Sequence, residues 1–340
     1  MCTGISITSK EGNVFFGRTM DLAMGMFGED PDSAIPTVIL TLPKNHLLDS
    51  QLSPWQTKYT TMGMGVKDTT ILYDGINDQG LSGDTQVLME TTRDSKENIQ
   101  SRGLIPLLGE EFVTYVLSQY ASVQEIKANY KKFALVDTPF MMGDVPMQFP
   151  LHYTFIDPTG EQIVLEPTDN GAFVLYDGIG VVTNSPEYSY HTTNIRNYIS
   201  LSNYDPTKQK RINEKYTMQP IEMGTGYGMF GLPGDYTSPS RFVRAFLLSN
   251  ALDSFEGKDG INQLYSVFRS VIIPRGLEHA SATSDMTDYS RYWVGYDLTN
   301  QTMYVQTGEG IAFTSKKIDL SLSEINYENV NTTNRVTTVL

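Results

Sequence analysis

Cys2 is the residue whose type and position are best suited to chemistry. It is the only cysteine of the chain and directly follows Met1. Removal of Met1 would place a thiol and a free α-amino group on one residue, and an α-amino group with a reference pKa of about 7.7–8 accepts protons well near neutral pH. We therefore expect Met1 to be removed and Cys2 to be a nucleophile that carries its own base. The alternative is a small, buried hydrophobic cysteine.

Arg18 and Asp21 lie where they could assist this terminus. The runs Ile5–Thr8 and Val14–Arg18 predict an N-terminal hairpin, because a five-residue segment with Gly and Asn separates them. The second strand of the hairpin then brings Arg18 and Asp21 close to Cys2. A guanidinium would favour a thiolate, and a carboxylate would hold a protonated amine. A structural ion pair at the end of a strand is the alternative interpretation.

Two further polar residues lie where strands or loops meet predicted helices. Asn184 follows an apolar strand and precedes Ser185-Pro186, a context that is also typical of a turn or a helix cap. Arg241 lies in the first turn of a predicted helix, where the helix dipole disfavours a cation. This position indicates a role for Arg241 beyond helix stability, with simple surface placement as the alternative.

Short β-type runs occupy both ends of the chain, and helical periodicity is concentrated in blocks between them. Asp157-Pro158-Thr159-Gly160 fits a type I turn, and Asp177-Gly178 is a pair favoured in tight hairpins. The predicted strands are Ile5–Thr8, Val14–Arg18, Thr37–Leu42, Thr69–Tyr73, Gly80–Val87, His152–Ile156, Gln162–Glu166, Ala172–Tyr176, Gly180–Thr183, Arg291–Leu298 and Thr302–Gln306; the predicted helices are Leu107–Leu117, Val123–Phe133, Tyr190–Ser200, Ser240–Leu252 and Gly260–Val271. Hairpin strands with helices grouped between them favour an α+β fold of antiparallel sheets covered by helices.

Composition narrows the functional class. The chain has 340 residues, 40% of them hydrophobic, and no linker rich in Pro, Gly or Ser, so we expect a single globular domain over residues 2–340. A net charge of -14 without a basic run argues against a nucleic-acid partner. Without a signal-like or membrane-spanning segment, we expect a cytoplasmic protein that does not bind membranes. The scattered histidines and the lone cysteine predict no metal site.

The glycine-rich stretch at residues 224–231 invites comparison with a phosphate-binding loop. It has neither the Gly-Lys-Ser/Thr ending nor the preceding strand that such a loop requires. We interpret it as a flexible surface loop, which could lie beside a substrate pocket.

Six blocks spread along the chain carry a more specific signal. They are Met1-Cys2-Thr3, Gly17–Asp21, Tyr73–Leu81, Leu151–Phe155, Val182–Pro186, and Gly231–Asp235 with Ser240-Arg241-Phe242. In this order they resemble the choloylglycine hydrolases, the penicillin V acylase and conjugated bile salt hydrolase family of the N-terminal nucleophile (Ntn) hydrolase superfamily. The resemblance covers nearly the whole chain. It implies an αββα four-layer sandwich of two antiparallel sheets between helical layers, a cytoplasmic homotetramer, and no metal or organic cofactor.

The resemblance also implies roles for individual residues. Cys2 would be the nucleophile, with Arg18 and Asp21 as its neighbours. Asn184 would donate to the oxyanion, and Arg241 would stabilise charge. The second oxyanion donor would be the backbone N–H of Val87, where relatives often carry Asn or Tyr. Valine keeps this donor, so the difference bears on side-chain contacts and substrate preference more than on the reaction.

The expected substrate is a small linear amide with an apolar acyl group. The segment Arg18-Thr19-Met20-Asp21 is similar to the penicillin V acylase version of its block, which favours penicillin V; a glycine- or taurine-linked bile acid is the alternative, and dual activity is a third option. The residues expected to line the acyl pocket are Met20, Leu22, Met24, Met26, Phe27, Phe140, Met141 and Met142, each of which could instead serve core packing.

Three other classes compete with the hydrolase interpretation. A purely structural or interaction protein would leave the coincidence of Cys2 with the other blocks unexplained. An inactive protein of the same fold could bind acyl groups or bile acids, but it would be expected to have lost Cys2, Asp21 or Asn184, and all three are present. A cysteine protease would need a histidine near the thiol. The sequence offers no recognisable cysteine–histidine motif, yet it leaves open that His152 or His191 lies nearby in space.

Overall fold

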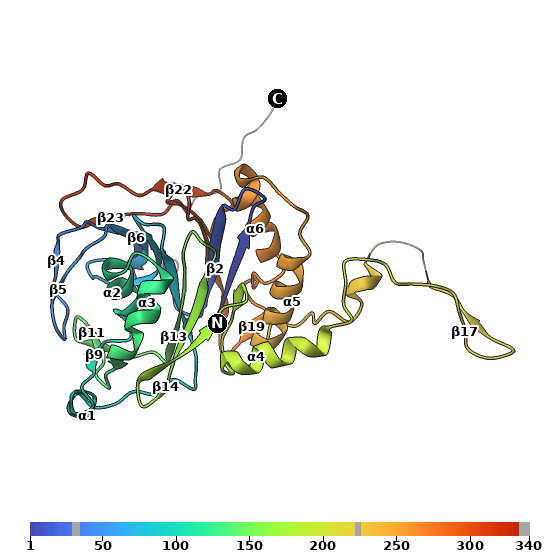
Figure 1. Ribbon diagram of the computed structural model, residues 1–340, viewed down its shortest axis with the longest axis horizontal. Coiled ribbons are helices and arrows are strands. Elements are labelled where there is room, and N and C mark those ends of the chain that lie inside the picture. Colours follow the sequence, from blue (N-terminus) through green and yellow to red (C-terminus); the bar gives the residue numbers. More distant parts are fainter. Residues whose placement is uncertain (29–34, 222–225, 333–340) are drawn as a thin grey trace.

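The computed structural model describes residues 1–28, 35–221 and 226–332, and two large sheets lie face to face at its centre (Figure 1). Sheet A runs in the order β16 (Val181–Val182), β1 (Cys2–Thr8), β2 (Val14–Leu22), β20 (Thr287–Asp297), β21 (Thr302–Thr307) and β22 (Thr314–Lys317), with β19 (Glu278–His279) also paired to β20. All of these pairings are antiparallel.

Sheet B is the larger of the two. Its order is β23 (Asn326–Glu328), β3 (Thr37–Leu42), β6 (Thr61–Val66), β7 (Leu72–Asn77), β8 (Ser82–Val87), β13 (Leu151–Ile156), β14 (Gln162–Asp169), β15 (Ala172–Asp177), β10 (Phe133–Leu135) and β9 (Ile105–Leu107), of which β9 and β10 run parallel. Three small hairpins complete the described strands: β4 (Leu47–Leu48) with β5 (Trp55–Gln56), β11 (Phe140–Met142) with β12 (Val145–Met147), and β17 (Lys210–Arg211) with β18 (Thr217–Met218).

Helices cover the outer face of each sheet (Figure 1). The helices are α1 (Lys96–Ser101), α2 (Phe112–Gln119), α3 (Val123–Asn129), α4 (Tyr188–Asn194), α5 (Ser238–Asn250) and α6 (Gly260–Phe268). Helices α5 and α6 pack on sheet A, where Phe242 and Leu264 join the apolar cluster of Ile5, Phe15 and Trp293. Helices α2 and α3 lie on sheet B. The layer order is therefore αββα, and the predicted α+β fold is confirmed.

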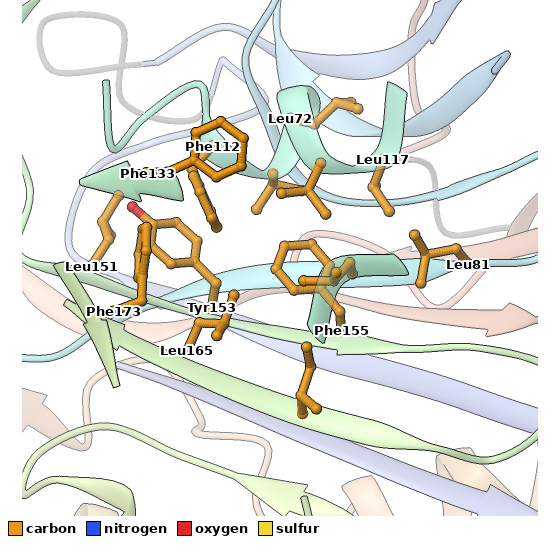
Figure 2. Packing of buried hydrophobic residues seen from close by; sticks show 14 of the residues in the cluster. Leu72, Leu81, Phe112, Leu117, Phe133, Leu151, Tyr153, Phe155, Leu165 and Phe173 are labelled. Carbon is orange, nitrogen blue, oxygen red and sulfur yellow. The ribbon is translucent and has the colours of Figure 1, made fainter. Parts of the chain in front are cut away.

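Each interface between layers has its own apolar core. Figure 2 shows the cluster between α2 and sheet B, in which the ring of Phe112 lies 4.5 Å from the rings of both Tyr153 and Phe173. A second cluster fills the space between the two sheets and includes Phe16, Met62 and Tyr292. Cys2 belongs to this second cluster, so the N-terminus is held inside the sandwich rather than left loose at the surface.

Most predicted elements are confirmed, and two predictions are wrong for physical reasons. The Asp157–Gly160 turn closes through a hydrogen bond from Gly160 N to Asp157 O of 2.9 Å. The hairpin predicted across Asp177-Gly178 does not form, because β16 leaves sheet B and pairs with β1 of sheet A. The helix predicted from Leu107 begins only at Phe112, since Ile105–Leu107 pairs with β10 as a strand.

Residues 226–231 of the glycine-rich stretch belong to the projecting segment, residues 199–221 and 226–237 between α4 and α5, which carries β17 and extends from the body of the molecule (Figure 1). Gly224 and Thr225 lie outside the described residues. The following Gly226 has φ of 102°, and Ser202 N donates to Gly228 O at 2.9 Å, so this turn is tied to the segment itself. Among the described helices, none is long and apolar enough to cross a bilayer.

Candidate active site

The register of β1 and β2 places Cys2, Arg18 and Met20 on one face of sheet A. Cys2 lies opposite Met20, and Gly4 lies opposite Arg18. Side chains on a strand alternate between the two faces, so these residues point together toward sheet B. A Cβ atom on Gly4 would lie 2.9 Å from Nε2 of Gln86 on β8, so glycine allows the close approach of the two sheets here.

The Cys2 sulfur is buried and bonded to a cation. Nη2 of Arg18 donates to Sγ of Cys2 over 2.7 Å and also lies 3.4 Å from Sδ of Met20. The Cys2 residue is 2% exposed, and Arg18 is fully buried. Burial alone lowers the pKa of Arg18, but Cys2, Tyr292, Asp84 and Asp74 together raise it, so the guanidinium stays charged. The guanidinium therefore lies where it can stabilise negative charge that develops on the sulfur.

The backbone nitrogen of Cys2 is fixed by the side chain of Asn184. This nitrogen donates to Oδ1 of Asn184 at 2.8 Å, and Nη2 of Arg241 donates to the same oxygen at 2.8 Å. Nδ2 of Asn184 points the other way and donates to the carbonyl of Val87 at 2.9 Å. The backbone N–H of Asn184 donates to Oγ of Ser238 at 3.0 Å, which locks the residue beside helix α5.

The backbone N–H of Val87 lies on the same side of β8 as the Asn184 amide. Leu88 N donates to Pro150 O at 2.9 Å, and Val87 is the partner of Leu151 in the next register position. Bonded and non-bonded pairs alternate along an antiparallel ladder, so the N–H and C=O of Val87 both point away from β13. The carbonyl of Val87 follows this expectation because it accepts the Asn184 amide.

Arg241 enters the site from the outer face of sheet A. Its Nη1 donates to the Cys2 carbonyl at 2.5 Å and to Oγ1 of Thr3 at 2.6 Å. The side chain is fully buried, and burial lowers the pKa of Arg241 while Asp21 and Cys2 oppose this shift. Arg241 therefore donates both to the backbone of Cys2 and to the side-chain amide of Asn184. These contacts explain why a cation lies in the first turn of α5.

Asp21 lies at the open end of the same hairpin. Its backbone N–H donates to the Met1 carbonyl at 2.9 Å, and the Met1 amino group donates back to the Asp21 carbonyl. The carboxylate accepts from Oγ1 of Thr19 at 3.0 Å and from Oγ of Ser290 at 2.5 Å. A bulge between Met20 and Asp21 in the pairing with β20 places this carboxylate beside the terminus.

A cavity of about 730 Å³, counting the solvent space at its mouth, opens onto Cys2 between the sheets. Its lining residues are Cys2, Arg18, Met20, Leu22, Met24, Ile35, Val66, Ile71, Tyr73, Thr85, Gln86, Val87, Glu110, Phe140, Met142, Met147, Phe149 and Leu151. Apolar side chains dominate this wall. A bound molecule could thus present a carbonyl to the sulfur while an apolar group fills the interior.

The predicted pocket residues divide into two groups. Met20, Leu22, Met24, Phe140 and Met142 line the cavity. Other predicted residues lie elsewhere: Phe27 sets its ring edge against Tyr292 at 6.2 Å, Met26 is 1% exposed in the core between the sheets, and Met141 is 40% exposed on β11. Closeness to Met20 in the sequence therefore does not decide which residues line the cavity, since Met24 lines it but Met26 and Phe27 do not.

The structure adds residues that sequence reasoning missed, above all Asp84 and Gln86. Both lie on β8 near Arg18, and Gln86 also lines the cavity. A signal was present in the sequence, since Ser82, Asp84 and Gln86 form a polar period-two stripe in the predicted strand Gly80–Val87, and the structure buries all three.

The two histidines bond backbone carbonyls beside Asn184. Nε2 of His152 lies 2.9 Å from the Thr183 carbonyl, and Nε2 of His191 lies 2.8 Å from the Asn184 carbonyl. The Cys2 sulfur instead meets Arg18 and Met20. The geometry thus supports no cysteine–histidine pair, and within residues 1–28, 35–221 and 226–332 no group of three His, Cys, Asp or Glu side chains could hold a metal ion.

Known proteins resemble this chain over most of its length. The family model of linear amide C–N hydrolases, the choloylglycine hydrolase family, matches residues 2–337. A bile salt hydrolase/transferase from Clostridium perfringens is 31% identical over 85% of this chain and 85% of its own length. A conjugated bile acid hydrolase from Lactobacillus acidophilus is 30% identical over 94% of this chain and 96% of its own length.

Two solved structures have a fold similar to that of this chain. A crystal structure of a variant conjugated bile acid hydrolase from Clostridium perfringens matches with a TM-score of 0.87 and 27% identity, covering 100% of both chains. Penicillin V acylase from Agrobacterium tumefaciens matches with a TM-score of 0.71 and 18% identity over 96% of this chain and 90% of its own, a likeness of fold alone. The chain therefore belongs to the choloylglycine hydrolase family and is an Ntn-type hydrolase of linear amide C–N bonds.

Proposed function

We propose that this enzyme uses Cys2, exposed as the N-terminal residue by loss of Met1, to cleave a linear amide whose acyl side is apolar. The observation that carries the proposal is the position of the Cys2 sulfur, which opens onto an apolar cavity and is bonded to Nη2 of Arg18 at 2.7 Å. The sulfur attacks the amide carbon, and the C–N bond breaks to leave a thioester and a free amine. Water then releases the acid and restores the thiol.

The α-amino group of Cys2 is the proposed base. While Met1 is attached, this nitrogen is an amide that donates to Oδ1 of Asn184, and an amide nitrogen has no lone pair free to accept a proton. Once free, the amine takes the thiol proton and later gives a proton to the leaving amine. Asp21, held by Thr19 and Ser290 beside the terminus, would orient the ammonium form.

The proposed oxyanion donors are Nδ2 of Asn184 and the backbone N–H of Val87. Support comes from their direction. Nδ2 of Asn184 donates to the Val87 carbonyl, and the Val87 N–H points to the same side of β8 as that carbonyl. Arg241 fixes this arrangement, because it donates to Oδ1 of Asn184 and so sets which end of the amide is the donor. Donors placed in advance on a developing oxyanion commonly supply a large part of an enzyme's rate.

Penicillin V is the first proposed substrate. Its phenoxyacetyl group is apolar and carries no hydrogen-bond donor, which suits a wall made chiefly of methionine, leucine, isoleucine, valine and phenylalanine side chains. Flexible methionines such as Met20, Met24 and Met142 can adapt to more than one acyl shape.

A conjugated bile acid is the second candidate, and two observations favour it. The relatives at 31% and 30% identity are named for bile salt or conjugated bile acid hydrolysis. In addition, the carboxylate of Glu110 lines the cavity, and its Oε2 is buried without a hydrogen-bond partner in the described part of the protein. A steroid hydroxyl could donate to that oxygen.

A side-by-side rate comparison tests the proposal. Purified enzyme lacking Met1 is assayed on penicillin V, on glycine- and taurine-linked bile acids and on a simple phenoxyacetyl amide. Hydrolysis of at least one, abolished by Cys2→Ser, supports the proposal. A protein that binds these molecules but cleaves none of them would instead be a binding protein of the same fold.

We further propose a cytoplasmic homotetramer built from one domain over residues 2–340, as the family resemblance implies. The projecting segment supports assembly, since Ile199, Tyr204, Ile221 and Phe230 are 90%, 76%, 99% and 82% exposed. Large exposed apolar side chains commonly mark contact with a partner, here a second copy. Light scattering should give four times the chain mass, and Tyr204→Asp with Ile221→Asp should lower it; a monomer in the unaltered protein contradicts the assignment.

A further inference from the structure

Two carboxylates face one another directly behind the nucleophile. Asp74 on β7 and Asp84 on β8 are register partners, and both are fully buried. Like charges directly opposite on neighbouring strands repel, so such a pair needs a counter-charge or a proton. Arg18 crosses from sheet A to supply that charge. Its Nη1 lies 3.6 Å from Asp74 and its Nε lies 3.8 Å from Asp84.

The same guanidinium therefore faces three groups that can carry a negative charge. One nitrogen, Nη2, donates to the Cys2 sulfur, and the other two approach the aspartates. A single positive charge cannot neutralise a thiolate and two carboxylates in a buried site. At least one of the three must hold a proton.

The hydrogen bonds decide which carboxylate is the better anion. Asp74 accepts from the hydroxyl groups of Tyr292, at 2.6 Å, and Tyr296. Asp84 accepts only from Nε2 of Gln86 at 2.8 Å, and its Oδ1 has no partner among the described residues. Asp74 is thus the better anion of the two, and Asp84 is the group that more readily takes up the proton.

Burial raises the pKa of both carboxyls, and at Asp74 this shift is opposed by Arg18 and by the hydroxyl groups of Tyr292 and Tyr296. Burial raises the pKa of Asp84 to about 6, although Arg18 and Gln86 oppose the shift. Burial also raises the pKa of Tyr292 and Tyr296 far above their ordinary value, which keeps both phenols as donors. The other charged or titratable groups around the cluster are Tyr73 on β7, His152 on β13, Asp21 and Arg241 on the far side of Cys2, and, once Met1 is lost, the α-amino group of Cys2 itself.

We propose that Asp84 is a positioning residue that shares one negative charge with Cys2 across Arg18. When the sulfur is a thiolate, Asp84 is protonated and Arg18 serves the sulfur; when Asp84 is ionised, Arg18 is drawn toward it and the thiol form is favoured. The proposal rests on Cys2 being the nucleophile, but the coupling itself concerns ionisation and needs no substrate. It adds Asp84, and Gln86 as its hydrogen-bond donor, to the residues that set the reactivity of the sulfur.

The coupling can be measured from the Cys2 side. The rate of alkylation of Cys2 by iodoacetamide, followed against pH in enzyme lacking Met1, reports the thiolate. Asp84→Asn removes the competing anion, so the midpoint of this profile should fall by about one pH unit. Asp169→Asn is the matched control, since Asp169 is exposed at the end of β14 in the same sheet. An Asp84→Asn midpoint that is unchanged or higher overturns the proposal.

The reciprocal measurement keeps the test valid even if Asp84→Asn fails to fold. Coupling between two sites is equal in both directions. The titration of the Asp84 carboxyl, followed by NMR of carbon-13-labelled aspartate, should therefore shift to lower pH in Cys2→Ser by the same amount. An Asp84 titration that is identical with and without the thiol overturns the proposal. Because neither arm requires hydrolysis, a wrong substrate assignment would leave both results unaffected.

Discussion

Arg18 donates from Nη2 to the Cys2 sulfur over 2.7 Å, a contact between neighbouring strands of sheet A at the reacting atom. Cys2 lies on β1 and Arg18 on the neighbouring β2. The guanidinium of Arg18 also contacts the carboxylates of Asp74 and Asp84 in sheet B. The charge that stabilises the nucleophile is therefore also part of the interior of the sandwich. Changes to Arg18 should affect both reactivity and stability.

Replacing Arg18 with glutamine should lower the free energy of unfolding at pH 7 by about 3–5 kcal/mol, because it leaves Asp74 and Asp84 buried without a cation. Urea denaturation measures this loss. The double variant Arg18→Gln/Asp84→Asn should recover part of the stability, since it removes one of the two uncompensated charges. Equal stability of the single and double variants would contradict this account.

The stability of the protein should depend on the ionisation of Asp84. The folded pKa of Asp84 is about 6, against an ordinary 3.8, so the folded state binds this proton more tightly than the unfolded state does. The protonated Asp84 carboxyl therefore adds at most about 3 kcal/mol to the free energy of unfolding. This contribution is fully present below pH 3.8 and is lost as the pH rises through 6. As the pH rises from 4 to 7, the free energy of unfolding measured with urea should fall less in Asp84→Asn than in the unaltered protein. Parallel pH profiles would refute the assignment.

Replacing Asn184 with aspartate should lower kcat by a factor of about 10²–10³ with a smaller change in KM, because the variant keeps the Oδ1 acceptor for Cys2 and Arg241 but loses the Nδ2 donor. Steady-state kinetics on whichever amide is cleaved measure this effect. Asn197→Asp, on the exposed turn after α4, is the control. If kcat stayed within about threefold of the unaltered enzyme, Asn184 would not be an oxyanion donor.

Replacing Glu110 with glutamine should alter substrate choice. Arg93 and the Phe149 N–H hold Oε1 of Glu110, which leaves Oε2 for a substrate donor. For hydroxylated bile acid conjugates, kcat/KM should fall about tenfold, whereas for a phenoxyacetyl amide it should change little. Glu111→Gln is the control, since its carboxylate bonds Ser50 and it is absent from the described cavity wall. A uniform loss on both substrates would assign Glu110 a structural role only.

The sequence predicted the parts of the site that depend on local order. Cys2, Arg18 and Asp21 fall on one hairpin, so strand patterning and a short turn were enough to bring them together. Asn184 and Arg241 could be placed only through the family resemblance, because the contact between them spans two distant segments, β16 with its following loop and α5.

The remaining features depend on how the two sheets stack. The pairing of β16 with β1 is non-local, and the Asp177-Gly178 turn signal pointed to the wrong partner. The contact of Arg18 with Asp84 crosses from one sheet to the other, and Ile35, Met147 and Phe149 reach the cavity from segments with no common periodicity. Such contacts follow from tertiary packing, which local propensity does not encode.

Intact-mass spectrometry of the active enzyme, quenched with acid during turnover, tests directly whether N-terminal Cys2 is the nucleophile. We expect a chain that lacks Met1 and a fraction that carries the acyl group of the substrate, with peptide mapping placing the added mass on Cys2. Active enzyme that still retains Met1, or an acyl adduct on any other residue, would contradict the proposed catalyst.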